Sequence, residues 1–211
     1  MADAPRDPPI TSPPIRLAVC ASGAGTTLQN LIDLIRAKKL KAQIVQVVAS
    51  RPRIEAIPRA EAAGIPLALA NRAAKSLSEF SRSVFDPIRH SKADLVVLGG
   101  FLSLVEIPPE YQGRVINVHP SLIPAFCGEG FHGQAVHKAV VESGVKVTGC
   151  TVHIATAEVD AGPILAQEPV RVEPDDTEET LHERIKGVER RLYPETIRLF
   201  MVQLQEGGAT A

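Results

Sequence analysis

The sequence predicts an α/β fold in which a mostly parallel, twisted sheet carries helices on both faces and has an antiparallel C-terminal part. Two observations support this prediction. Short apolar runs alternate with helical patterns over residues 15–119, as in consecutive βαβ units with right-handed crossovers. Further along the chain, two strand-like runs are separated only by a turn, which indicates a hairpin and therefore a mixed sheet.

The first predicted strand, residues 15–21, is a β-rich run that ends in small residues. A tight turn at residues 22–27 leads into a helix over residues 28–39, whose apolar side chains recur with helical spacing. The continuous apolar run at residues 42–49 is typical of a buried parallel strand. The same alternation then predicts a helix over residues 54–63, a strand over 66–70, a helix over 76–91, and strands over 94–98 and 114–119.

The pattern changes after residue 119. A helix is predicted over residues 131–143, followed by strands over residues 146–154 and 163–172. The last helix starts with the acidic stretch at residues 175–179 and runs toward Phe200. Acidic residues suit the positive end of the helix dipole, so this stretch is a favourable helix start.

Composition predicts one domain over residues 15–206, preceded by a lead-in at residues 1–14 whose prolines oppose both helix and strand formation. The net charge is −1, without the basic stripe expected of a nucleic-acid-binding protein. No apolar run reaches the roughly 20 residues of a membrane span. The three cysteines, Cys20, Cys127 and Cys150, lack C-x-x-C spacing, which argues against a disulfide framework and structural zinc and favours the reducing cytosol.

The turn at residues 22–27, Ser-Gly-Ala-Gly-Thr-Thr, joins a strand to the N-terminus of a helix, where free N–H groups bind anions. The hydroxyls of Thr26 and Thr27 add donors. A dinucleotide-binding loop would have a third glycine where Leu28 stands, and a P-loop would have a lysine. Two interpretations of this loop therefore remain: a binding site for a monophosphate, and a tight turn that binds no ligand.

Asn117 and His119 are two residues apart on a predicted strand, so their side chains share one face near its C-terminal end. An amide beside an imidazole is suited to binding an oxyanion, although a purely structural role fits each residue alone. Asp160 lies in a turn, where aspartates usually bond the local backbone. If it meets His119, its carboxylate raises the imidazole pKa and orients the ring. The histidines show no metal-binding spacing, Cys127 has no identifiable activating base, and Glu189 is by default a surface helix residue.

Six motifs occur in one order that resembles the phosphoribosylglycinamide formyltransferase family. They are SGAGTTLQ from Ser22, GGF from Gly99, INVHPSLIP from Ile116, GCTVH from Gly149, VDAGPI from Val159, and Glu189 near Tyr193-Pro194. The resemblance covers about residues 15–200, and the Asn-x-His-Pro-Ser-Leu-x-Pro string with a later Asp-x-Gly-Pro is its most specific part. It implies a Rossmann-like formyltransferase fold.

The resemblance also implies a reaction, in which the formyl group of 10-formyltetrahydrofolate, the co-substrate, passes to the amine of glycinamide ribonucleotide without a metal. Asn117 and a protonated His119 would stabilise the oxyanion, and Asp160 would orient His119 and keep it charged. We expect Asp160 within hydrogen-bond reach of His119, directly or through one water. The other implied residues are Gly25, Thr26, Thr27 and Glu189 for the ribonucleotide, Leu102, Ser103, Leu104, Val105, Asn117, Thr156, Ala157, Glu158, Val159 and Asp160 for the folate, and His153 as a support.

Two segments depart from the family or vary within it. Leu77 stands where relatives often place a folate-binding Arg, so the anchor of the folate tail does not follow from the motifs. The loop from Cys127 to Gly133 is one of several versions, and its substrate contacts do not follow from sequence either. The analogy allows a homodimer.

Four alternatives stay open at this point. Formyltetrahydrofolate deformylase shares the catalytic trio but normally has a preceding regulatory domain. Methionyl-tRNA formyltransferase needs a C-terminal domain and a basic surface. An NADP-dependent oxidoreductase is disfavoured by the missing third glycine, and a non-catalytic nucleotide-binding module leaves Asn117, His119 and Asp160 unexplained.

Overall fold

The computed structural model describes residues 13–73 and 75–205. The strands are β1 (Ile15–Ala21), β2 (Ala42–Ala49), β3 (Leu67–Leu69), β4 (Leu95–Leu98), β5 (Val115–His119), β6 (Val147–Ile154) and β7 (Ile164–Arg171). The helices are α1 (Thr26–Arg36), α2 (Ala56–Ala62), α3 (Leu77–His90), the 3₁₀ turn η1 (Pro109–Tyr111), α4 (Gln134–Ser143) and α5 (Glu178–Gln205). Residues 1–12 of the predicted lead-in and residue 206 of the predicted domain lie outside the described residues.

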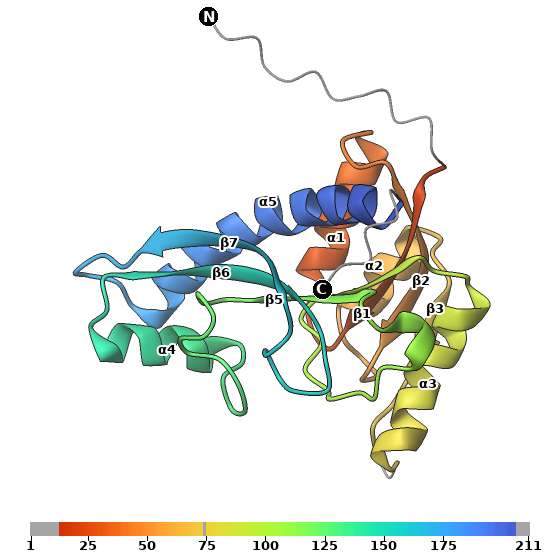
Figure 1. The fold of residues 1–211 in the computed structure, drawn as a ribbon, viewed down its shortest axis with the longest axis horizontal. Coiled ribbons are helices and arrows are strands. Elements are labelled where there is room, and N and C mark those ends of the chain that lie inside the picture. Colours follow the sequence, from red (N-terminus) through yellow and green to blue (C-terminus); the bar gives the residue numbers. More distant parts are fainter. Residues whose placement is uncertain (1–12, 74, 206–211) are drawn as a thin grey trace, which may run out of the picture.

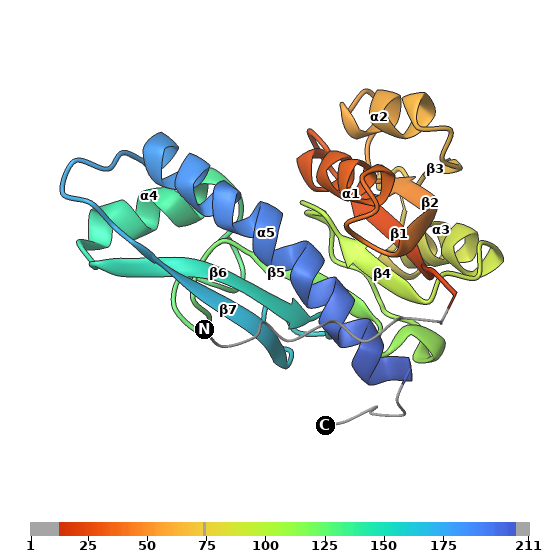
Figure 2. The same cartoon turned by 90° about the horizontal axis from the view of Figure 1, so that it is seen from above.

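One sheet runs through the molecule in the order β3-β2-β1-β4-β5-β6-β7 (Figures 1 and 2). The pairs from β3 to β5 are parallel, whereas β6 and β7 pair antiparallel. The predicted α/β fold with a mixed sheet is thus confirmed. Since the chain leaves β1 toward β2 and later returns to β4 on its other side, the order reverses between β1 and β4. In open α/β sheets, ligands bind at the carboxyl ends of strands at such a reversal.

The two faces of the sheet bury separate cores. In β1, Leu17 and Val19 pack into the core shared with α1, α2, α4 and α5, whereas Ala18 and Cys20 pack into the core shared with α3. This alternation follows from the two-residue period of a strand. Figure 2 shows α5 crossing the sheet from β6 and β7 toward α1, so that one helix links both halves. Among the described residues, no helix has both the length and the apolar composition needed to cross a membrane.

Several helix starts differ from the prediction by two or three residues, α2 and α5 among them, and a glycine determines two of these starts. Helix α1 begins at Thr26 rather than Leu28, because Gly25 takes a left-handed conformation (φ 68°) as the residue before the helix. Helix α4 begins at Gln134 rather than Phe131, after Gly133 with φ 57°. In both places the apolar period alone could not locate the boundary, since a glycine conformation determines it. The turn η1 was not predicted.

Candidate active site

A cavity of about 610 Å³ opens at the carboxyl ends of β1, β4 and β5. It is lined by the glycine loop, the segment after β4, the end of β5, the loop from Gly128 to Gly133, the β6–β7 turn and one face of α5. Every predicted site residue lines it except Ala157, and Leu77 instead lies in the first turn of α3. The fold therefore collects at one place nearly all the residues that the motifs indicated.

Gly25 shapes the end of the cavity formed by the glycine loop. A Cβ at this position would lie 2.7 Å from both Cα and Cβ of Ala56 in α2, so a side chain has no room. Two residues further along, the hydroxyl of Thr27 donates to Oε1 of Glu189 in α5 over 3.0 Å. Burial raises the pKa of Glu189, and the bond from Thr27 only partly opposes this shift. Glu189 is thus a half-buried cavity residue rather than an ordinary surface residue of α5.

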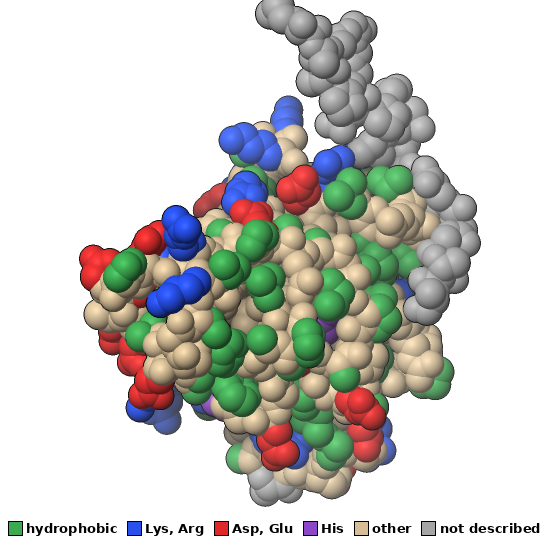
Figure 3. Space-filling model, turned by 60° about the vertical axis from the view of Figure 1, so that its left-hand side comes forward, with side chains coloured by type: hydrophobic (Ala, Val, Ile, Leu, Met, Phe, Trp, Pro, Cys, Tyr) green, Lys and Arg blue, Asp and Glu red, His purple; other side chains and the backbone are tan. Residues whose placement is uncertain are grey.

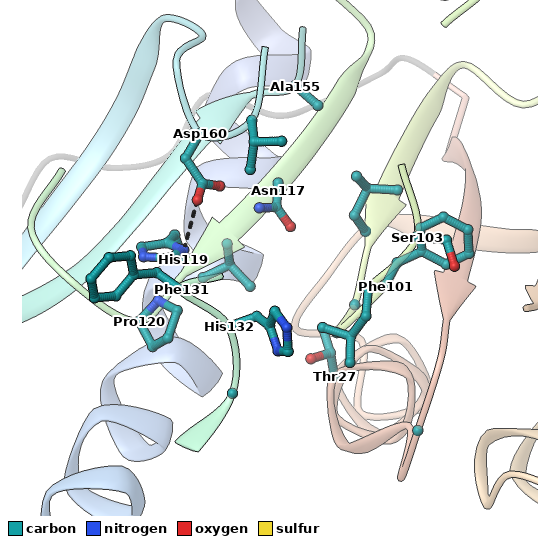
Figure 4. Close-up of a pocket in the computed structure, with 18 of the residues that line it drawn as sticks. Thr27, Phe101, Ser103, Asn117, His119, Pro120, Phe131, His132, Ala155 and Asp160 are labelled. Atoms are coloured by element: carbon teal, nitrogen blue, oxygen red, sulfur yellow. Dashed lines mark ion pairs between the residues drawn. The ribbon is translucent and has the colours of Figure 1, made fainter. Parts of the chain in front are cut away.

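Asp160 contacts both histidines of the neighbouring strands. Its Oδ2 lies 3.3 Å from Nδ1 of His119 (Figure 4). Its Oδ1 lies 3.5 Å from Nε2 of His153. The backbone N–H of Gly128 also donates to Oδ2 over 3.0 Å. The first distance confirms that Asp160 lies within hydrogen-bond reach of His119. Asp160 has φ 55°, an uncommon value for a residue other than glycine, as occurs at functional sites.

The ring nitrogens of His119 both face acceptors. Nε2 lies 2.8 Å from the carbonyl oxygen of Phe126, and Nδ1 faces Asp160. A neutral ring has one N–H and serves only one of these acceptors, whereas an imidazolium serves both.

Burial as well as Asp160 affects the pKa of His119. Burial lowers the pKa of His119 below its usual value and outweighs the opposing effects of Phe126 and Asp160. Asp160 acts in the expected direction, but its effect is smaller than that of burial. Burial also acts to raise the pKa of Asp160, yet the nearby rings of His153 and His119 and the hydrogen bond from Gly128 outweigh it, and that pKa is lowered. Asp160 is therefore an ionised carboxylate.

Asn117 is oriented by His153. Its Nδ2 lies 3.2 Å from Nε2 of His153, whose Nδ1 lies 3.0 Å from the carbonyl oxygen of Ile154. A ring that donates from Nδ1 to Ile154 accepts from Asn117 at Nε2, so one of the two amide hydrogens of Asn117 stays available to the cavity. The strand register places these residues opposite each other, because β5 pairs with β6 at Asn117 and His153.

The segment after β4 forms an apolar wall. Phe101 stacks on Phe80 with ring centroids 6.4 Å apart, and the backbone N–H of Leu102 donates to Ser22 Oγ over 3.0 Å. Leu102, Leu104 and Val159 keep about half of their surface exposed at this wall (51%, 50% and 50%). Apolar side chains that stay open to a cavity are typical of sites for flat aromatic ligands.

Sequence reasoning missed several residues of the cavity. The carbonyl of Phe126 and the N–H of Gly128 could not be found, because backbone groups leave no mark in the residue type. His182 and Lys186 were also missed, although they recur at helical spacing with the predicted Glu189 along α5, and that pattern could have revealed a cavity-lining face. Within the described residues, no group of three His, Cys, Asp or Glu is arranged to hold a metal ion.

Charged side chains of both signs are spread over the surface. On the face drawn in Figure 3, acidic and basic side chains lie mainly toward the edges and hydrophobic ones nearer the middle. The cavity itself is lined by four carboxylates and a single lysine, Lys186, among the described residues.

Comparison with known proteins gives one consistent result. Residues 15–197 match the formyl transferase family. The chain is 33% identical over 186 residues to the phosphoribosylglycinamide formyltransferase of Bacillus subtilis, covering 87% of this chain and 93% of that protein. It is 39% identical to the trifunctional purine biosynthetic protein adenosine-3 of Gallus gallus, covering 92% of this chain but only 19% of that relative.

Solved structures agree. The glycinamide ribonucleotide transformylase 1 of Symbiobacterium toebii superposes with a TM-score of 0.82 at 39% identity, covering 89% of this chain and 87% of that one. The phosphoribosylglycinamide formyltransferase of Bacillus halodurans gives a TM-score of 0.79 at 35% identity, covering 89% and 95%. These superpositions confirm the expected Rossmann-like formyltransferase fold. The chain therefore belongs to the formyl transferase family.

Proposed function

We propose that this chain transfers the formyl group of 10-formyltetrahydrofolate to the amine of glycinamide ribonucleotide, a step of purine biosynthesis. The observation that carries the proposal is the single cavity that joins the glycine loop and Glu189 to Asn117, His119 and Asp160. One end suits a phosphate and the polar part of a ribonucleotide. The apolar wall at Leu102, Leu104 and Val159 suits the folate ring, so both substrates can meet beside the polar trio.

The chemistry begins with attack of the amine nitrogen on the formyl carbon, which forms a tetrahedral intermediate. The free amide hydrogen of Asn117 is placed to bind its oxyanion. Neutral His119 has one ring nitrogen without a proton. In this proposal that nitrogen turns from its neighbouring acceptor toward the attacking amine, takes the proton that the amine loses, and the ring returns as an imidazolium. Asp160 and the Phe126 carbonyl then accept from both ring nitrogens, which stabilises the charged ring.

Collapse of the intermediate breaks the bond between the formyl carbon and the folate nitrogen. The proton held by His119 passes to that nitrogen, so the ring returns to its neutral state. Low intrinsic basicity suits this cycle, because a ring that binds its proton tightly would release it slowly. Asp160 orients the ring throughout, and His153 orients Asn117.

The test is a formyl-transfer assay with the ribonucleotide present and absent. Ribonucleotide-dependent release of tetrahydrofolate, with formylated product, is the expected result. Equal formyl release without the ribonucleotide would instead identify a deformylase. No turnover in either condition would contradict both activities.

A further inference from the structure

Histidines are concentrated around the cavity. Five of the six in the sequence line it, and the sixth, His90, lies on α3. The proposed chemistry uses His119 and His153 only. His137 and His182 form a separate pair between α4 and α5, on the wall that also carries Glu189.

His137 is almost fully buried, with 1% of its surface exposed. Its Nε2 lies 3.0 Å from Nδ1 of His182, and the two rings meet edge to face with centroids 4.8 Å apart. Burial, followed by the neighbouring His182, lowers the pKa of His137 to about 4, so this ring is neutral near pH 7. Its Nδ1 is buried and has no hydrogen-bond partner among the described residues.

The unpartnered Nδ1 of His137 indicates where the protons of His137 and His182 lie. If His182 donated to His137, the single proton of His137 would sit on the buried Nδ1 as an unpaired N–H. Unpaired buried N–H groups are rarer in proteins than unpaired acceptors. His137 therefore carries its proton on Nε2 and donates to Nδ1 of His182. Neutral His182 then carries its own proton on Nε2, the nitrogen that faces away from His137.

His182 lies on the α5 face that lines the cavity. Lys186 is one helical turn further along, and Glu189, which contacts Thr27, is about 10 Å from His182 along the axis. A ligand that extends along this face from the glycine loop meets Glu189, then Lys186, then His182. The described cavity lining offers few other side-chain donors along this path.

We propose that His182, oriented by His137, is a further ribonucleotide-positioning residue, which donates from Nε2 to an oxygen of the ribose or glycinamide part. The inference rests on the proposed function and deepens it. It assigns His182 to the ribonucleotide, because His182 lies on the same helix face as Glu189, and not to the folate. It also explains why a buried histidine with an unpartnered nitrogen is retained beneath it.

The experiment compares His182→Phe, His182→Gln and the control His90→Phe, using kcat and the KM of each substrate. The loss of one neutral hydrogen bond typically weakens binding by about 3–10-fold, so H182F should raise the ribonucleotide KM by that factor. The folate KM and kcat should stay within about 2-fold. H182Q keeps an N–H near the position of Nε2 and should restore the ribonucleotide KM, and H90F should change nothing.

An unchanged ribonucleotide KM in H182F, an equal rise in H182Q, or a change confined to kcat or the folate KM would overturn the inference. His137→Leu, added to H182F, should raise the ribonucleotide KM no further, because His137 acts through His182. A further rise of the ribonucleotide KM in the double variant would show that His137 does not act through His182. Thermal melting of each variant checks that it is folded. Absence of ribonucleotide-dependent transfer by the unaltered chain would instead refute the proposed function, whereas normal transfer with an indifferent H182F would refute only this inference.

Discussion

Oδ2 of Asp160 lies 3.3 Å from Nδ1 of His119, and each side chain is more than nine-tenths buried. Asp160→Asn removes the charge that raises the pKa of His119, so this pKa, already lowered by burial, should fall further. The acidic limb of kcat against pH should lie below the usual histidine range in the unaltered protein and move to still lower pH in D160N. We expect kcat to fall by about 10²–10⁴-fold at pH 7.5.

Histidine titration by NMR gives the pKa directly. Asp86→Asn, an exposed carboxylate on α3, is the matched control and should leave both kcat and the His119 titration unchanged. A D160N variant with unaltered kcat would exclude Asp160 from the chemistry.

Asn117→Ala removes the proposed oxyanion donor. The loss of one such donor typically costs about 10²–10³-fold in rate, and we expect kcat to fall by this amount with little change in either KM. Asn71→Ala, in the exposed loop after β3, is the control. Near-normal turnover of N117A, with its melting temperature preserved, would rule out the role.

Glu189 gives a prediction about stability and pH. Because burial raises the pKa of Glu189, the folded state holds its proton more tightly than the unfolded state does. The free energy of unfolding must then fall as pH rises from the ordinary carboxyl pKa through the raised one. Glu189→Gln lacks this loss, so its melting temperature should exceed that of the unaltered protein at pH 8, and the difference should shrink toward pH 4. Glu195→Gln, exposed on the same helix, should show no such trend, and a constant difference for E189Q would contradict the assignment.

Gly25 and Gly64 form a matched pair. Both have a left-handed backbone, with φ of 68° and 67°, but a Cβ at Gly64 meets nothing within 4 Å. Gly64→Ala should therefore cost only the conformational term, about 1–2 kcal/mol. Gly25→Ala adds the clash with Ala56, about 1–3 kcal/mol more, and should also raise the ribonucleotide KM. Denaturant unfolding and kinetics measure both, and equal effects of the two variants would show that the Ala56 contact is unimportant.

Much of the fold could be predicted because its signals are local. The apolar runs of β1, β2 and β4 are buried parallel strands, and the capping box of Ser76 and Glu79 marks the start of α3. Helix starts at Thr26 and Gln134 were predicted wrongly, since glycine conformations and not side-chain periodicity determine them. The spacing of apolar residues shows which face of a helix is buried. It does not show where the helix begins, because the same spacing can continue past the helix end.

The parts of the site that lie close together in the sequence could be predicted from their spacing, and the parts that lie far apart could not. Asn117 and His119 share one strand, so their common face follows from the two-residue period. Their meeting with Asp160 crosses 41 residues and followed only from the family pattern. The raising effect of Asp160 on the His119 pKa was predicted correctly, but burial, which no motif reports, outweighs it and lowers that pKa. His137 and His182, 45 residues apart, meet only once α4 and α5 pack together.

The crowding of histidines gives the cavity its own set of reporters. Each imidazole carries a Cε1–H group whose NMR signal responds to protonation and to neighbouring ligands. A protein labelled only at histidine would give six signals: two from the strand ends, one from the loop, two from the helix pair, and His90 as an internal reference outside the cavity. Titration with each substrate alone would then show separately which wall that substrate occupies, before any turnover takes place.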